Sequence, residues 1–423
     1  MTHAPKDSAA AAPGTAPLRL DVVAGLVAAA VVLPKAMAYA TVAGLPVAVG
    51  LYTAFIPMLI YALLGASRVL SVSSTATLAI LVGAQLDSVV PDGDPGRLAV
   101  ATATLGVMVG LLLILARLLR LGFVANFISA PVLTGFKAGI GLVIVLDQVP
   151  KLLGLHLHKQ AFFRDLVALL QQLPATSWLT LAVAAGSFAL LVALERWKPH
   201  SAAPLVAVAA AIAASWHFGL QAVGVATVGE IPRGLPTPVG PDADLLQVLL
   251  PGALGIALMS FTETIAAARA FARPGDPPID ANRELVATGA ANLGGAVLGA
   301  MPAGGGTSQT AVVRAVGGRS QRASLVTAAA ALATMLLLAP LLGLLPQATL
   351  AAIVIVYSVG LVEPAEFRAI RSVRTMEFRW AVAAAAMSPS TESNTNRPRF
   401  SPRQSPTMTI APIRKPRAGR SIG

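Results

Sequence analysis

Three ionisable side chains lie deep inside long apolar stretches of the sequence: Lys35, Lys137 and Glu263. A charge at the centre of a bilayer costs about 2.5–3.5 kcal/mol on insertion scales, so such a group faces protein or a watery cavity. Lys35 follows Val22, the start of its stretch, by 13 residues, or about 20 Å of helix. Reaching the interface by snorkelling is the alternative for Lys35, and it is a poor one from that depth. We therefore predict functional roles for Lys35 and Glu263, and a structural pairing for Lys137.

Two short segments add groups that bind anions. They are LSVSSTATLAI at 70–80 and GGGTSQTAVV at 304–313. The amino end of a helix presents unpaired N–H groups and a positive dipole end, which bind anions without a charged side chain. Hydroxyls add donors, and glycine lets the backbone approach a ligand closely. The predicted anion-binding residues are Lys35, Ser73, Ser74, Thr75, Gly305, Gly306, Thr307, Ser308 and Gln309. No catalytic residue and no cofactor is predicted.

The composition indicates that these groups sit in a membrane protein. Of 423 residues, 56% are hydrophobic and only 12% are charged, whereas soluble domains carry about 25% charged residues. Half of the net charge of +12 lies in the last 36 residues, so it gives no reason to expect nucleic acid as a partner. The sequence has no cysteine, which excludes disulfides, thiolate metal sites and cysteine nucleophiles.

The apolar stretches predict twelve membrane spans and the start of another, because about 20 helical residues cross the hydrocarbon layer. The third and tenth are too short to cross alone, and they lie seven elements apart. Paired short segments of this kind indicate half-helices at the midplane site of an inverted-repeat transporter. The predicted fold is all-helical, with two interlocked repeats of seven. Its spans lie near 22–39, 47–64, 72–86, 98–119, 124–146, 178–194, 204–218, 245–269, 284–300, 308–316, 323–345 and 349–361, with a thirteenth beginning at 378.

Basic residues predict the orientation. With the N-terminus inside, the inner connections hold 17 Lys and Arg and the outer ones hold five, in agreement with the positive-inside rule. We expect a disordered cytoplasmic segment at 1–17, a membrane transport domain at 18–387 and a multi-pass location in the cell's inner, cytoplasmic membrane. The segment before Leu18 has no basic start or apolar middle, so the first span is expected to stay as an anchor.

Several motifs resemble the SulP family, the sulfate-permease-type anion transporters. The resemblance begins with LPKAMAYATVAGLPVAVGLYTAFIPMLIYALLGASRVLSVSSTATLAIL and continues through GFKAGIGLVIVLDQVPKLLG, SFTETIAAARAFA, ELVATGAANLGGAVLGAMPAGGGTSQTAV and LLPQATLAAIVI. It covers about residues 18–384. It implies fourteen spans in two inverted repeats, a core domain moving against a gate domain, and an anion held between the third and tenth spans. Members carry sulfate, bicarbonate, chloride, nitrate or dicarboxylates, often with Na⁺ or H⁺. The family also implies homodimers.

The sequence departs from this family at the site. Many members have Gln at the place of Lys35 and Arg at the place of Gln309. This exchange suggests that one positive charge has moved from one wall of the anion site to the other. A Gly-Pro pair common at the third span is Ser73-Ser74 here, so the anion selectivity of other members does not carry over to this sequence.

Similar members place an acid where Glu263 stands, and there it serves cation coupling. If Glu263 pairs with Lys35, its protonation would free Lys35 for the anion and give proton symport. In a rival hypothesis, the coupling ion is Na⁺, held near Glu263. In a third, Glu263 only forms an ion pair that packs two helices together.

The end of the sequence also departs from the family. Residues 388–423 are rich in Ser, Pro and Arg and lack apolar periodicity, so we expect a disordered basic tail without a STAS domain and an incomplete second repeat. A shifted reading frame, a truncated gene or a tail that touches anionic lipid would each account for this segment.

The alternative function for the whole chain is a non-transporting remnant of such a transporter. A membrane-embedded enzyme is disfavoured because all five His fall in loops or near the ends of spans, away from Glu263. A nucleobase carrier is disfavoured by Lys35 and by the two half-helices, which suit an anion.

Overall fold

The architecture comes from a computed structural model, which describes residues 18–126, 145–146, 148–155, 162–197, 202–231, 234, 237–273 and 276–359. The first half contains α1 Leu18–Val42, α2 Val47–Leu64, β1 Val72–Ser73, α3 Ala76–Val89, α4 Pro95–Leu118, η1 Leu121–Asn126, α6 Phe162–Gln172, η2 Leu173–Ala175, α7 Trp178–Trp197 and α8 Ala203–Phe218. The second half contains η3 Ala243–Leu245, α9 Leu246–Ala270, α10 Ala281–Val297, β2 Gly304–Gly305, α11 Thr307–Ala315, α12 Arg322–Ala333, η4 Thr334–Leu338, α13 Ala339–Gly343 and α14 Gln347–Val359.

Four sequence predictions lie outside the described residues. They are the pairing of Lys137, the segment at 1–17, the thirteenth span from 378 and the tail at 388–423. The span predicted at 124–146 is described only at its ends.

The helices have the length and exposure of membrane spans. Six of the described helices are long and apolar enough to cross a bilayer. Among them, α7 has 20 residues, or about 30 Å of helix, which matches the hydrocarbon thickness. Trp178 and Trp197, at its two ends, are 78% and 88% exposed. Tryptophan at both ends of a span is typical of the two membrane interfaces.

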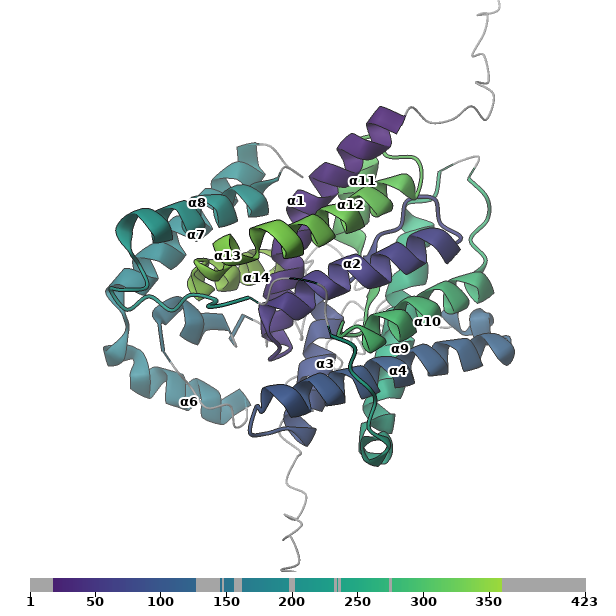
Figure 1. Ribbon diagram of the computed structural model, residues 1–423, viewed down its shortest axis with the longest axis horizontal. Helices are drawn as coiled ribbons and strands as arrows, with labels where there is room; N and C mark the ends of the chain where they lie inside the picture. Colours follow the sequence, from purple (N-terminus) through teal and green to yellow (C-terminus); the bar gives the residue numbers. More distant parts are fainter. Residues whose placement is uncertain are drawn as a thin grey trace, which may run out of the picture.

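The helices form two groups that meet along α1 (Figure 1). The core group consists of α1–α4 and α9–α12, in which α10 packs on α2 and α4, and α12 packs on α1 and α2. The gate group consists of α7, α8 and α14, which pack on one another. Helix α1 belongs to the core group and also contacts α8 and α14. Residues on α1 are therefore placed to interact with both groups.

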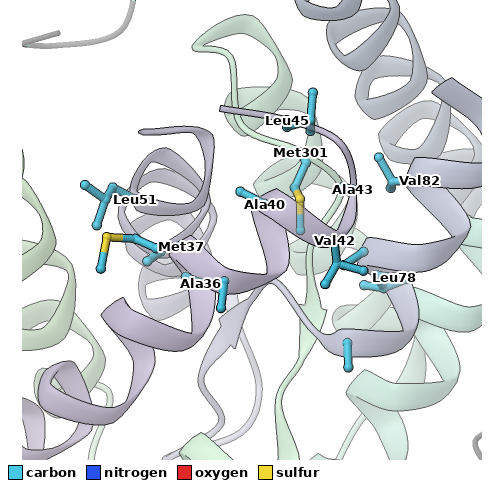
Figure 2. Close-up of a cluster of buried hydrophobic side chains, with 14 of the residues drawn as sticks. Ala36, Met37, Ala40, Val42, Ala43, Leu45, Leu51, Leu78, Val82 and Met301 are labelled. Atoms are coloured by element: carbon cyan, nitrogen blue, oxygen red, sulfur yellow. The ribbon is translucent and has the colours of Figure 1, made fainter. Parts of the chain in front are cut away.

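The apolar core surrounds the end of α1. In Figure 2, Val42 lies near Leu78 of α3, and Met301, which precedes β2, lies near Ala40. Where α1 meets α2, a glycine and an alanine let the backbones approach closely. A Cβ added at Gly50 of α2 would lie 2.1 Å from the carbonyl oxygen of Ala36, a distance that real Cβ atoms do not reach. This packing fixes α1 against the start of α3 and the segment that leads into β2.

The two short segments are half-helices, as the sequence predicts, but each begins as a strand. Helices α3 and α11 have 14 and 9 residues, so neither crosses the hydrocarbon layer alone. Before them, β1 and β2 pair antiparallel, with Val72 opposite Gly305 and Ser73 opposite Gly304. The strand ladder was not predicted. A run of two residues has no periodicity that distinguishes it from a loop.

Candidate functional site

The strand ladder places the amino ends of α3 and α11 at a common site. Because the strands are antiparallel, the two helices leave the ladder in opposite directions, and both amino ends face it. The Thr75 side chain caps α3 by accepting a hydrogen bond from the Leu78 N–H. Gly306 is the N-cap residue of α11, and its N–H donates to the Ser71 carbonyl at 3.0 Å. The remaining amides of both first turns stay near the ladder, where an anion can accept from them.

Glycine at position 305 is required by close packing against α9. A Cβ at Gly305 would lie 2.6 Å from the Thr264 Cα. The Gly305 N–H also donates to the Thr264 hydroxyl at 3.0 Å. Since the clash is with backbone, a rotamer change cannot relieve it. Glycine in this segment therefore positions β2, and with it the amino end of α11.

We expect Gly305→Ala to destabilise the protein by about 1–3 kcal/mol, the usual range for overpacking. The displaced ladder should also reduce anion uptake. Thermal unfolding in detergent would measure the first effect and uptake into vesicles the second. Gly255→Ala is the matched control, because a Cβ at that exposed helical position meets nothing within 4 Å. A Gly305→Ala protein as stable as the control would contradict this account.

Three buried hydroxyls at the ladder have no hydrogen-bond partner within the described part of the chain. They belong to Ser71, Ser73 and Ser74. Ser71 and Ser73 are 0% exposed and Ser74 is 5% exposed. Buried polar atoms in native proteins are normally paired, so unpaired ones require an explanation. A ligand that accepts hydrogen bonds, as an anion does, would pair them.

The Lys35 ammonium lies at the α11 side of this site. Its Nζ donates to the Ser308 hydroxyl at 3.3 Å and lies 3.4 Å from the centroid of the Tyr357 ring. Lys35 is only 6% exposed. Together with Ser308, Tyr357 and Glu195, it lines a cavity of about 190 Å³. The structure thus places the buried charge beside the first turn of a half-helix, as the sequence predicts.

Glu263 lies at the α3 side. Its carboxylate accepts a hydrogen bond of 2.7 Å from the hydroxyl of Thr75, the residue that caps α3. Glu263 is 8% exposed. Two pairs of predicted site residues are therefore in contact: Lys35 with Ser308 of α11, and Glu263 with Thr75, the N-cap of α3.

Two predicted residues on α11 have other surroundings. The Gln309 amide donates to the Ser71 carbonyl at 3.0 Å and is 5% exposed, so it ties the first turn of α11 to the residue before β1. Thr307 is exposed. The hydroxyl of Thr310, which was not predicted, accepts from the Ser71 N–H at 3.1 Å. Both backbone groups of Ser71 are thus held by α11.

An ion-pair cluster holds the far end of α11. The Arg314 guanidinium donates to the Phe271 carbonyl at 2.8 Å and to the Asp276 carboxylate at 2.7 Å. Burial alone would raise the pKa of Asp276, but the Arg273 N–H, the Arg314 guanidinium and the charge of Arg68 together hold that pKa below its ordinary value. The ionised carboxylate therefore anchors α11 to the connection after α9.

Two residues at the site were missed by the sequence analysis. Tyr357, on α14, covers the Lys35 ammonium with its ring and donates from its hydroxyl to Glu195 of α7 at 2.6 Å. Glu195 is followed by Arg-Trp-Lys, so it reads as part of an interfacial charge group. No local pattern connects it with Lys35, because the contact arises only when α1, α7 and α14 pack together.

Comparison with known proteins agrees with this fold. A sequence model of the sulfate permease family matches residues 18–384. A probable sulfate transporter of Mycobacterium tuberculosis is 40% identical over 87% of this chain and 66% of its own length. Human solute carrier family 26 member 6 is 32% identical over 81% of this chain and 48% of its own length. The chain thus spans two thirds or less of these relatives.

Solved structures show the same architecture. The structure of SLC26A9 has a TM-score of 0.83 at 25% identity and covers 88% of this chain and 63% of its own. The transmembrane domain of the cyanobacterial bicarbonate transporter BicA has a TM-score of 0.80 at 25% identity and covers 89% of this chain and 96% of its own. From the half-helices at the ladder, the family match and these likenesses, we conclude that the chain belongs to the sulfate permease family and is a multi-pass membrane protein.

Proposed function

We propose that the chain is a secondary transporter of small inorganic anions, with sulfate as the first candidate substrate. The observation that carries the proposal is the ladder itself, which brings together two helix amino ends and three serine hydroxyls that have no partner among the described residues. Lys35 is hydrogen-bonded to Ser308, on the first turn of one of these helices. These groups are donors or positive charges, which suits an anion. The names of the relatives support sulfate and bicarbonate as substrates to test, and chloride and dicarboxylates follow them.

The proposed location is the cytoplasmic membrane, with the N-terminus inside. The surplus of Lys and Arg in the inner connections supports this orientation. Alternating access is proposed as the mechanism, with the core group moving relative to the gate group. A homodimer is proposed as the assembly, and its mass in detergent would test that.

Uptake by the reconstituted protein tests the proposal. We expect vesicles containing the purified chain to accumulate radiolabelled sulfate, and unlabelled sulfate to compete better than bicarbonate or chloride. Ser73→Ala with Ser74→Ala should weaken uptake, because it removes two donors at the ladder. Ser88→Ala serves as the control, since that hydroxyl is exposed and donates to the Gln85 carbonyl. Absence of uptake of every anion tested would reject transport by this chain.

Glu263 is the proposed coupling residue. Its carboxylate accepts from Thr75, so a proton or Na⁺ that binds the carboxylate would change the hydrogen bonding of the α3 cap. Since Lys35 contacts Ser308 and Tyr357, we place the coupling in the Glu263–Thr75 contact rather than in a direct pair with Lys35.

We expect Glu263→Gln to abolish the response of uptake to one cation gradient, because Gln neither ionises nor carries a charge for Na⁺. Uptake would be measured under an imposed pH gradient and, separately, a Na⁺ gradient. Loss of the pH response identifies proton coupling, and loss of the Na⁺ response identifies Na⁺ coupling. Uptake by Glu263→Gln that follows both gradients as before would exclude this residue from coupling.

A further inference from the structure

We propose that Tyr357 and Glu195 form a clasp on the Lys35 ammonium, which the transported anion must displace. This inference rests on the proposed function, because it assumes that Lys35 binds the anion. We call Lys35, Tyr357 and Glu195 the Lys35 clasp. It adds two residues to the site and gives them a role as competitors of the substrate.

The contacts of the clasp are continuous. The Lys35 Nζ lies over the Tyr357 ring, 3.4 Å from its centroid. On the same ring, the hydroxyl donates to the Glu195 carboxylate at 2.6 Å. Lys35, Tyr357 and Glu195 all line the same cavity. The Tyr357 ring therefore connects the Glu195 carboxylate with the Lys35 ammonium.

The hydroxyl bond and the ring contact reinforce each other. The face of an aromatic ring attracts a cation through its quadrupole. A phenol that donates to a carboxylate gains electron density in its ring, because hydrogen bonds in a chain polarise one another. Glu195 therefore strengthens the attraction of Tyr357 for Lys35. Burial increases this effect, since a desolvated cation–π contact is stronger than an exposed one.

The clasp joins the two helix groups. Lys35 is on α1 of the core group, whereas Glu195 is on α7 and Tyr357 is on α14 of the gate group. Ser308, the other partner of Lys35, is on α11 of the core group. If the core group moves relative to the gate group, the Ser308 contact travels with Lys35 and the Tyr357 contact breaks. An anion that neutralises the ammonium weakens the clasp and so favours that movement.

This arrangement predicts an unusual result for substitutions at Tyr357. Removing a competitor lowers KM, whereas removing an anion ligand raises it. We expect Tyr357→Leu to lower the KM for sulfate about 3- to 10-fold, within the range of a cation–π contact. Tyr357→Phe keeps the ring and loses the bond to Glu195, and Glu195→Gln keeps an acceptor and loses the charge. Both should lower KM by a smaller factor, about 2-fold.

Cysteine labelling measures the same clasp without transport. The natural chain has no cysteine, so Ala311→Cys places one thiol at the wall of the cavity that the clasp lines. We expect a membrane-impermeant maleimide to label this thiol faster in the Tyr357→Leu background than in the parent. Tyr52→Leu, a half-buried tyrosine on α2, is the control and should change neither KM nor labelling.

The outcomes separate the clasp from the proposed function. A higher or unchanged KM in Tyr357→Leu overturns the clasp while transport stands. An unchanged labelling rate also overturns it. If the parent protein transports no anion, the proposed function fails, and the labelling comparison still decides whether Tyr357 limits access to the cavity. Thermal unfolding of each variant shows whether it is folded before either comparison is made.

Discussion

Replacing Lys35 by Gln should raise the KM for sulfate by about 10- to 100-fold, the largest change in KM expected from a single substitution here. Hydrogen bonds to charged groups contribute about 1.5–3 kcal/mol, and each 1.4 kcal/mol is a factor of ten in affinity. Lys35 is 6% exposed and contacts Ser308 on the first turn of α11. Its charge is therefore little screened by water at the site where the anion would bind. Initial rates of uptake over a range of sulfate concentrations measure the effect.

A second substitution tests whether the position of the charge matters or only its presence. Gln309 lies on the same turn of α11 as Ser308, the residue that Lys35 contacts. Because the Gln309 amide already donates to the Ser71 carbonyl, a guanidinium there can keep that bond. We expect Lys35→Gln with Gln309→Arg to recover at least part of the lost affinity. Normal uptake by Lys35→Gln alone would show that the ammonium is not an anion ligand.

The sequence was sufficient to predict the half-helices and the buried lysine, because their signals are local. Lys35 is conspicuous in an apolar stretch, where each charge has a known cost. The Gly, Ser and Thr residues before α3 and α11 favour close backbone approach and hydrogen bonding over continued helix. The family match, the solved relatives and the structure agree with the fold predicted from these signals.

The partners of these residues could not be predicted, because they come from distant parts of the chain. Lys35 and Tyr357 lie on α1 and α14, and the contact depends on the crossing of two helices that share no sequence pattern. The strand ladder pairs Ser73 with Gly304 through backbone atoms only, so side-chain types reveal little about it. Gln309 is predicted at the anion, and the sequence does not reveal that its amide donates to the Ser71 carbonyl.

Replacing Glu284 by Ala should cause the largest loss of stability, about 3 kcal/mol or more. The carboxylate of Glu284 is 0% exposed. It accepts hydrogen bonds from the Tyr61 hydroxyl at 2.8 Å, the Ala66 N–H at 2.9 Å and the Ser67 N–H at 3.2 Å. Each buried donor left without a partner costs about 1–3 kcal/mol. Thermal unfolding in detergent measures the loss, compared with Val286→Ala as a control at a more exposed position of α10.

Graded variants distinguish lost hydrogen bonds from a lost side chain. In Glu284→Gln, the amide oxygen can still accept from the two backbone N–H groups, and the amide nitrogen can donate to Tyr61, so we expect a loss of only about 1 kcal/mol. Tyr61→Phe removes one bond and should cost a similar amount. Equal losses for Glu284→Gln and Glu284→Ala would mean that the charge, and not the bonding, stabilises the turn. The bonded turn leads directly into Ser71 and β1, so a protein that loses it should also lose anion uptake.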